Sequence, residues 1–374
     1  MNLTKLTDYL DSLPQELVPG IDVEIRQDHE TVFRHWTGWR DRENRVPMNG
    51  RELYWIFSAT KVFTVTAGMQ LIERGIIRPE DPVGMYLPAF STLSVNESGH
   101  IRACTVPLTV RHLFTMTGGF NYDLECPSLK KAALYSGGKA DTLTMINALA
   151  EEPLDFEPGA HYRYSLCHDV LAAVIESASG LRFSDYLRVN IFEPLGVKRT
   201  GFRGEDVSEF AAQYIYDEKT GRSVLHPDGN RCVYRLTDNY ESGGAGLYSC
   251  VDDYILLADA LACGGLGASG RRILKEDSIR LMTAPALTPA QREEFYNHMG
   301  RVYSYAMGVR TKVDADGTSP VGEFGWDGAA CAYALMDPIN RVSVFIGLHV
   351  RSFGYGYTVI HPRVRELLYE QINA

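Results

Sequence analysis

The chain has 374 residues, of which 45% are hydrophobic and 22% are charged. That composition supplies a sizeable core for two or three domains and excludes a mainly disordered chain. The chain has 37 basic and 47 acidic residues, which gives a net charge of −10, and the basic residues form no run rich in lysine or arginine. We therefore expect no nucleic-acid partner.

The hydropathy pattern and the cysteines bear on location. No stretch reaches about 18 apolar residues, so no membrane-spanning helix is expected. Polar and acidic side chains interrupt residues 1–13, which therefore lack the apolar segment of a secretory signal. Seven scattered cysteines, with no C-x-x-C pair among them, favour reduced thiols. Together these features predict a cytoplasmic protein.

The first part of the chain predicts a hairpin and then a helix. Residues 20–27 alternate apolar and polar side chains, and residues 31–38 follow after a short acidic turn. A short apolar run at 53–57 leads into a helical pattern over 59–74, with Gly75 as its C-cap.

The rest of the chain is helical in its middle and rich in strands near its end. Helical patterns lie at 109–116, 142–151, 168–179, 183–191, 251–263 and 357–372, and strand patterns lie at 303–313, 329–336 and 341–350. This order predicts an α/β (α+β) fold: an antiparallel β-sheet flanked by helices and built from both termini, with a mainly helical domain inserted. We expect residues 1–80 and 240–374 to form the sheet domain and 81–239 the helical one, with the active site at their junction.

One serine and one lysine are the candidate nucleophile and general base. The pattern Ser-x-x-Lys occurs three times, at Ser58/Lys61, Ser128/Lys131 and Ser136/Lys139. Only Ser58 lies where an apolar strand meets the start of an apolar-faced helix, so Ser58 and Lys61 project from one helix face. A lysine in an apolar wall loses hydration, which disfavours its charged form and lets it take a serine proton. On this segment alone, an N-capping serine with a solvent-directed lysine remains the alternative.

The segment around Ser58 resembles the nucleophile motif of the penicillin-recognising serine hydrolases. That family includes class C β-lactamases, D-alanyl-D-alanine carboxypeptidases, D-aminopeptidases and family VIII esterases. Its other motifs are resembled, in order and spacing, by residues 108–119, 158–165, 243–249 and 324–329. The likeness extends over roughly residues 15–372 and is far more specific than one Ser-x-x-Lys pattern.

The resemblance implies a β-lactamase/transpeptidase-like fold and an acyl-enzyme on Ser58. It implies that Lys61 and Tyr164 share the role of general base, and that the N–H groups of Ser58 and Ala329 form the oxyanion hole. The chemistry needs no cofactor. Because the ten histidines show no spacing typical of metal ligands, we also expect no metal.

Two departures from the family pattern bear on the substrate. The segment reads Tyr164-Ser165-Leu166 where many members have Tyr-x-Asn, so the amide that contacts a substrate carbonyl in β-lactamases is missing. Trp326 stands where β-lactamases and carboxypeptidases carry the lysine that binds a substrate carboxylate; family VIII esterases likewise have tryptophan. Both departures favour an uncharged acyl substrate, and we predict Trp326, Asp327, Gly328 and Ser165 to bind it.

Each of three further features has a functional and a structural interpretation. Arg351, just past the last strand, is a candidate to meet a substrate carboxylate; a solvated arginine at a strand end is the alternative. His168 and Asp169 are adjacent on a predicted helix and point in different directions, so we assign both to the core or the surface rather than to a triad. A G-x-G-x-x-G match at 265–270 follows a helix rather than a strand and predicts a surface loop.

The sequence therefore predicts a serine hydrolase, most simply a carboxylesterase for small uncharged acyl esters. The alternatives are an amide hydrolase of the β-lactamase, D-aminopeptidase or DD-peptidase type, and a non-catalytic binding protein with the same fold. The absent signal peptide favours esters over cell-wall amides. Segments 120–140, 205–240 and 284–300 are expected to shape the pocket, Trp326 is expected on an edge strand, and the oligomeric state is left open.

Overall fold

The computed structural model describes residues 1–204 and 207–373, and a large antiparallel sheet lies at its centre. The sheet has the order β10-β11-β12-β13-β14-β1-β2-β3, with antiparallel neighbours throughout. Its strands are Gly20–Gln27 (β1), Glu30–Asp41 (β2), Val46–Pro47 (β3), Tyr303–Tyr305 (β10), Arg310–Lys312 (β11), Phe324–Asp327 (β12), Tyr333–Asp337 (β13) and Val342–Gly347 (β14). The predicted antiparallel sheet built from both ends of the chain is confirmed.

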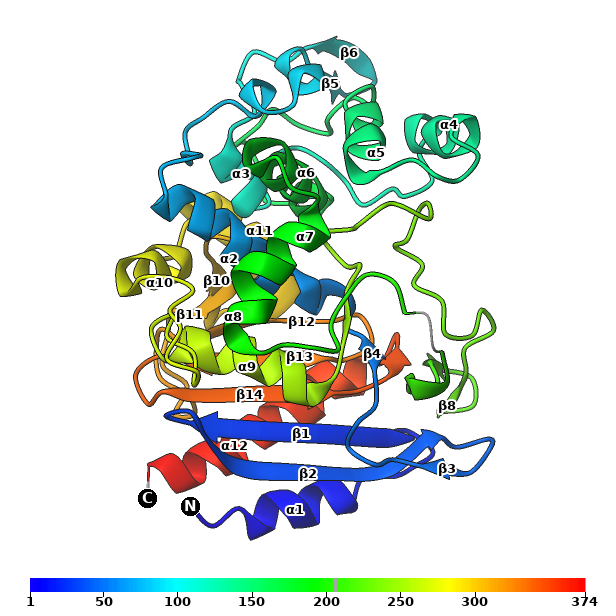
Figure 1. Cartoon of the computed structure of the whole chain (residues 1–374), viewed down its shortest axis with the longest axis vertical. Coiled ribbons are helices and arrows are strands. Elements are labelled where there is room, and N and C mark those ends of the chain that lie inside the picture. Colours follow the sequence, from blue (N-terminus) through cyan, green and yellow to red (C-terminus); the bar gives the residue numbers. More distant parts are fainter. Residues whose placement is uncertain (205–206, 374) are drawn as a thin grey trace.

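Helices pack on both faces of this sheet (Figure 1). Helices α1 (Thr4–Asp11) and α12 (His361–Ile372) cover one face, where their leucines pack with Val23 and Val344. Helix α9 (Val251–Ala262) covers the other face, and the ring of Tyr254 stacks on Phe345 with a centroid distance of 3.9 Å. Alternation of side chains along β14 therefore supplies a separate apolar core to each face.

Many of the remaining helices form a helical region beyond the second face, in the upper part of Figure 1. Helix α2 (Thr60–Glu73) is buried along nearly its whole length and contacts α6 (Cys167–Ser179). The other helices are Val110–Phe114 (α3), Pro127–Tyr135 (α4), Thr142–Leu149 (α5), Phe183–Leu187 (α7), Glu193–Leu195 (α8), Glu276–Thr283 (α10) and Pro289–Met299 (α11). Among the described residues, no helix is long and apolar enough to cross a membrane.

Smaller sheets are present beside the large one. Strand β4 (Tyr54–Trp55) pairs with β9 (Tyr248–Ser249), and β5 (Ser94–Glu97) pairs with β6 (His100–Ala103). A third sheet joins β7 (Tyr214–Asp217) to β8 (Arg222–Leu225) and, in parallel, to β15 (Val350–Arg351). Residues 214–225 thus pair with the C-terminal part of the chain although they lie within the segment predicted to be the helical domain. The division into 1–80 with 240–374, and 81–239, stays a proposal.

One prediction about the sheet is wrong: Trp326 does not lie on an edge strand. Its strand β12 is flanked by β13 on one side and by β11 on the other. The segment 303–313 was predicted as a single strand, but it turns at 306–309 and forms the hairpin β10–β11. That hairpin adds two strands beyond β12. The G-x-G-x-x-G match at 265–270 lies in the loop between α9 and α10, as predicted.

Substituting Gly325 by alanine is expected to destabilise the sheet. A Cβ at this position of β12 would lie 1.9 Å from the carbonyl oxygen of Ala334 on the neighbouring strand. Because that atom belongs to the backbone, strands β12 and β13 must separate to make room. We expect the free energy of unfolding to fall by roughly 2–4 kcal/mol, measured by denaturant titration. An unfolding midpoint equal to that of the unchanged protein would contradict this packing.

Candidate active site

Ser58 lies on a tight turn that leads into helix α2. The paired strand β4 enters this turn, a 3-10 turn over Phe57–Ala59. Phe57 has a φ of 44°, a left-handed conformation that costs a non-glycine residue about 1–3 kcal/mol. Its fully buried ring packs against Tyr234 with a centroid distance of 5.7 Å, which offsets that strain. The turn leaves the Ser58 side chain at the wall of a cavity of about 740 Å³.

Lys61 follows one helical turn later and is completely buried. Its Nζ lies 3.4 Å from the Oγ of Ser58 and donates a 2.7 Å hydrogen bond to the carbonyl oxygen of Gly244. It also lies 3.5 Å from the hydroxyl of Tyr122. The sequence-predicted pair is therefore brought together, and the alternative of a lysine directed to solvent does not hold.

Burial changes the acid–base chemistry of Lys61. Loss of hydration lowers the pKa of its ammonium group from 10.5 to about 7, although the negative charge of Asp169 acts in the opposite direction. Near neutral pH a substantial fraction of Lys61 is then the free amine, which can accept a proton from Ser58.

Tyr164 lies on the loop before α6 and faces the same cavity. The Nζ of Lys61 is 4.6 Å from the centre of its ring, and the Nε1 of Trp326 donates to its hydroxyl at 3.3 Å. Burial raises the pKa of the Tyr164 phenol, while hydrogen bonds with Ser58 and Trp326 act to lower it. The net upward shift keeps this phenol protonated at neutral pH.

The end of strand β12 forms another part of the cavity wall. Trp326 is almost fully buried and stacks on Tyr164 with a centroid distance of 5.6 Å. Asp327, Gly328 and Ala329 line the cavity beyond it. A Cβ on Gly328 would lie 2.2 Å from the carbonyl oxygen of Ile56, so this glycine allows the 327–329 backbone to approach the turn that carries Ser58.

Two predicted substrate-binding residues do not line the cavity. Ser165 is fully buried, and its hydroxyl contacts the sulfur atoms of Cys167 and Met116. It therefore belongs to the packing that supports Tyr164. Arg351 lies behind the Ser58 turn, with its guanidinium 3.0 Å from the Nε2 of His226 and 5.5 Å from the ring centre of Phe57.

Sequence reasoning missed the aromatic side chains that complete the site. The Tyr122 ring stacks on Tyr164 at 5.5 Å and meets Tyr234 edge-on at 5.9 Å. The Lys61 Nζ lies 5.5 Å from the ring centre of Tyr122 and 4.6 Å from that of Tyr164. Tyr122 and Tyr234 fall in segments 120–140 and 205–240, both expected to shape the pocket; residues 205–206 of the second lie outside the described residues. The one available signal was that Tyr122 follows the matched segment 108–119.

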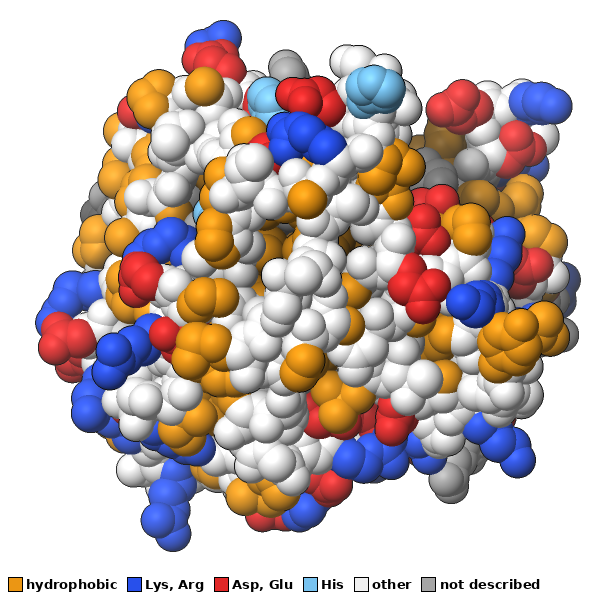
Figure 2. Space-filling model, turned by 90° about the horizontal axis from the view of Figure 1, so that it is seen from above, with side chains coloured by type: hydrophobic (Ala, Val, Ile, Leu, Met, Phe, Trp, Pro, Cys, Tyr) orange, Lys and Arg blue, Asp and Glu red, His pale blue; other side chains and the backbone are white. Residues whose placement is uncertain are grey.

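The charged groups facing the cavity are already paired. The Arg310 guanidinium donates to Asp327 at 2.6 Å and lies 3.7 Å from Glu323. Arg365 hydrogen-bonds the hydroxyl of Tyr303 and lies 3.9 Å from Asp316. The rest of the lining is largely aromatic, so the arrangement suits an uncharged group. Figure 2 shows one face of the whole molecule, on which side chains of both charge signs are interspersed towards the edges and the middle is mostly uncharged.

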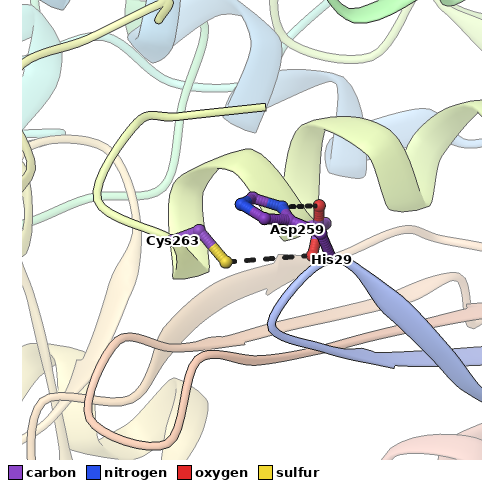
Figure 3. Close-up of side chains that lie close together, drawn as sticks. All are labelled: His29, Asp259 and Cys263. Carbon is purple, nitrogen blue, oxygen red and sulfur yellow. Dashed lines mark hydrogen bonds and ion pairs between the residues drawn. The ribbon is translucent and has the colours of Figure 1, made fainter. Parts of the chain in front are cut away.

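Within the described part of the chain, one group of side chains has metal-ligand chemistry. Figure 3 shows His29, from the β1–β2 turn, beside Asp259 and Cys263 at the end of α9. The Nδ1 of His29 lies 2.8 Å from Asp259, and the Cys263 thiol contacts the same carboxylate at 3.9 Å. These groups are partnered with one another and none of them lines the Ser58 cavity, so we assign them no part in the chemistry.

A serine beside a buried lysine, between a helical region and an antiparallel sheet, is the arrangement found in serine hydrolases with a β-lactamase/transpeptidase-like fold. The family model described as Beta-lactamase matches residues 6–354. The chain therefore belongs to the β-lactamase family, as the sequence motifs indicated.

Individual relatives agree with this assignment. Esterase EstB of Burkholderia gladioli is 29% identical over 273 residues, which cover 67% of either protein. Acyltransferase mokF of Monascus pilosus is 27% identical over 298 residues, covering 77% of this chain and 70% of that protein. Among solved structures, EstCE1, a hydrolase with promiscuous acyltransferase activity, superposes with a TM-score of 0.79 at 25% identity and covers 98% of both chains.

Proposed function

We propose that this protein is a serine carboxylesterase that acts on small, uncharged acyl esters through an acyl-enzyme on Ser58. The observation that carries the proposal is the buried Lys61 ammonium, whose Nζ is 3.4 Å from the Ser58 hydroxyl and whose pKa is about 7. A base with a pKa near the working pH is the most effective one for this step.

In the proposed reaction, the Ser58 Oγ attacks the ester carbonyl carbon and its proton passes to the free amine of Lys61. The negative oxygen that forms is held by the N–H groups of Ser58 and Ala329. The C–O bond to the alcohol then breaks, and the Tyr164 phenol gives its proton to the leaving oxygen and regains one from Lys61. Water attacks the acyl group by the same route and restores Ser58.

The side chains that line the cavity favour uncharged ester substrates over substrates that carry a carboxylate. Trp326 contributes an uncharged indole to the wall, and Arg310 and Arg365 are engaged with acidic partners. The described cysteines are all free thiols, which supports a cytoplasmic location as part of this proposal.

A substrate panel tests the proposal. We expect p-nitrophenyl acetate and butyrate to be hydrolysed, with kcat/KM for nitrocefin and D-alanyl p-nitroanilide lower by roughly 100-fold or more. The physical reason is that the cavity offers apolar walls and no unpaired charge of either sign among its described residues, whereas nitrocefin carries a carboxylate and D-alanyl p-nitroanilide an ammonium group. The measurement is initial rates by absorbance. Faster turnover of either amide would replace the esterase with the amide-hydrolase alternative, and turnover of none would favour the binding protein.

Acyl transfer to an alcohol is a second candidate function. It needs the same acyl-enzyme, with an alcohol in place of water as the acceptor. The names of mokF and EstCE1 both include this activity, and a cavity of about 740 Å³ is large enough to hold an acyl group beside an acceptor. Mass spectrometry of products formed from vinyl butyrate with and without an added primary alcohol separates transfer from hydrolysis.

A further inference from the structure

Asp169 is a buried carboxylate beside the site, and the reaction described above does not use it. It lies in the first turn of α6 and is only 1% exposed. Its Oδ1 accepts hydrogen bonds from the hydroxyls of Tyr240, at 2.8 Å, and Ser242, at 2.5 Å. Its Oδ2 is buried and has no hydrogen-bond partner among the described residues. An uncompensated carboxylate oxygen in a core is costly, so a nearby positive charge is expected to balance it.

The groups bonded to Asp169 belong to the same loop that holds Lys61. The Ser242 hydroxyl also accepts from the N–H of Ala245 at 3.0 Å, and the carbonyl of Gly244 accepts from the Lys61 ammonium at 2.7 Å. A Cβ on Gly244 would lie 2.4 Å from the Oδ2 of Asp169. Residues 240–245 are therefore pressed against the carboxylate on one side and bonded to Lys61 on the other.

Among the described titratable groups around Lys61, Asp169 is the one that supplies a negative charge. On α6, Asp169 favours the charged form of Lys61. Burial raises the pKa of the Cys167 thiol to about 11, so this thiol is neutral near pH 7. His168 of the same helix is fully buried, and burial lowers its pKa well below its usual value, so it is neutral. The phenols of Tyr122 and Tyr164, which face Lys61 from their loops, have raised pKa values and are neutral as well. Asp169 is thus the one carboxylate among the described groups found to act on Lys61.

We propose that Asp169 is the positioning residue of the Ser58–Lys61 pair: it anchors the 240–245 loop, whose Gly244 carbonyl orients the Lys61 Nζ, and its negative charge balances the ammonium form. This inference rests on the proposed role of Lys61 as general base. It gives Asp169 a function that the sequence pattern did not show, without making it part of a triad with His168.

The test is the variant Asp169→Asn. Its amide oxygen still accepts from Tyr240 and Ser242, so the loop keeps its anchors while the charge is lost. Removing a nearby negative charge disfavours the ammonium form, so we expect Lys61 to titrate about one pH unit lower. Proteins labelled with ¹³C at lysine Cε report this directly by NMR, with Lys61→Met to assign the resonance. The acidic limb of kcat/KM for p-nitrophenyl acetate should move down in parallel, with KM changed by less than about twofold.

A second variant and a matched control separate charge from anchoring. Ser242→Ala removes one hydroxyl bond to Asp169 and keeps the charge, and we expect kcat to fall roughly tenfold. Asp259→Asn removes an equally buried carboxylate on α9 and should leave both the Lys61 titration and kcat unchanged. Ester hydrolysis that survives in Ser58→Ala would contradict the esterase proposal. The NMR titration of Lys61 would still test, independently, whether Asp169 acts on Lys61. An unshifted Lys61 titration in Asp169→Asn, or, where that variant does not fold, a normal kcat in Ser242→Ala, overturns the inference.

Discussion

Replacing Ser58 by alanine is expected to abolish ester hydrolysis, with kcat/KM for p-nitrophenyl acetate falling by roughly 10⁴-fold or more. The substitution removes the Oγ that forms the covalent bond, and the remaining groups cannot supply a second nucleophile at the same wall of the cavity. The variant keeps the backbone N–H at this position, so the proposed oxyanion hole survives and accounts for any residual rate. Hydrolysis rates over several protein concentrations give the measurement.

A covalent probe makes this experiment sharper. A fluorophosphonate ester should add one adduct to the unchanged protein by intact mass, and none to Ser58→Ala. Ser136→Ala is the matched control, because Ser136 also precedes a lysine by three residues, yet its hydroxyl bonds the Ala133 carbonyl in a distant helix end. Labelling and turnover should be normal in that variant. An adduct that forms equally on Ser58→Ala places the nucleophile elsewhere.

The Ser58–Lys61 pair, Tyr164 and the main sheet could be predicted because short stretches of sequence indicate them. The change from an apolar strand to an apolar-faced helix at Ser58 is a local signal, and it placed Lys61 on the same helix face one turn later. Tyr164 was predicted from its position in a matched motif, since its residue type alone carries little information. The sheet contributed by both ends of the chain followed from the order of strand and helix patterns.

What the sequence could not show depends on contacts between distant segments. The Gly244 carbonyl that binds Lys61 is a backbone atom 183 residues away, and no side-chain pattern encodes it. The stacking of Tyr122 on Tyr164 depends on how two loops pack. The strand prediction for 303–313 failed because the turn at 306–309 interrupts one apolar run, and that turn moved Trp326 from the edge of the sheet to its interior.

Replacing Lys61 by methionine is expected to lower kcat/KM by roughly 10³-fold or more, because the base that receives the Ser58 proton is lost. Methionine has a similar length and suits a fully buried position, so the effect is chemical rather than structural. In the unchanged protein kcat/KM should rise with pH through about 7, where Lys61 becomes the free amine. The residual activity of Lys61→Met should lose that inflection. A variant that keeps a tenth of the activity, or the same inflection, would remove Lys61 from the role of base.

The same substitution should make the protein more stable at neutral pH, which distinguishes a functional lysine from a structural one. The Lys61 pKa is about 7 in the folded state and near its usual 10.5 in the unfolded chain. Between those values the unfolded chain binds more protons, so stability rises with pH by up to about 1.4 kcal/mol per unit. Below pH 7 Lys61 is protonated in both states, and the free-energy cost of burying it is at its largest; above about pH 10.5 this cost vanishes.

Lys61→Met removes this cost of burial. Its melting temperature should therefore exceed that of the unchanged protein most at pH 6, and the gap should close as the pH approaches 10. A gap that is absent at pH 6 would mean that the buried amine costs nothing, and the argument for a depressed pKa at the candidate site would fail with it.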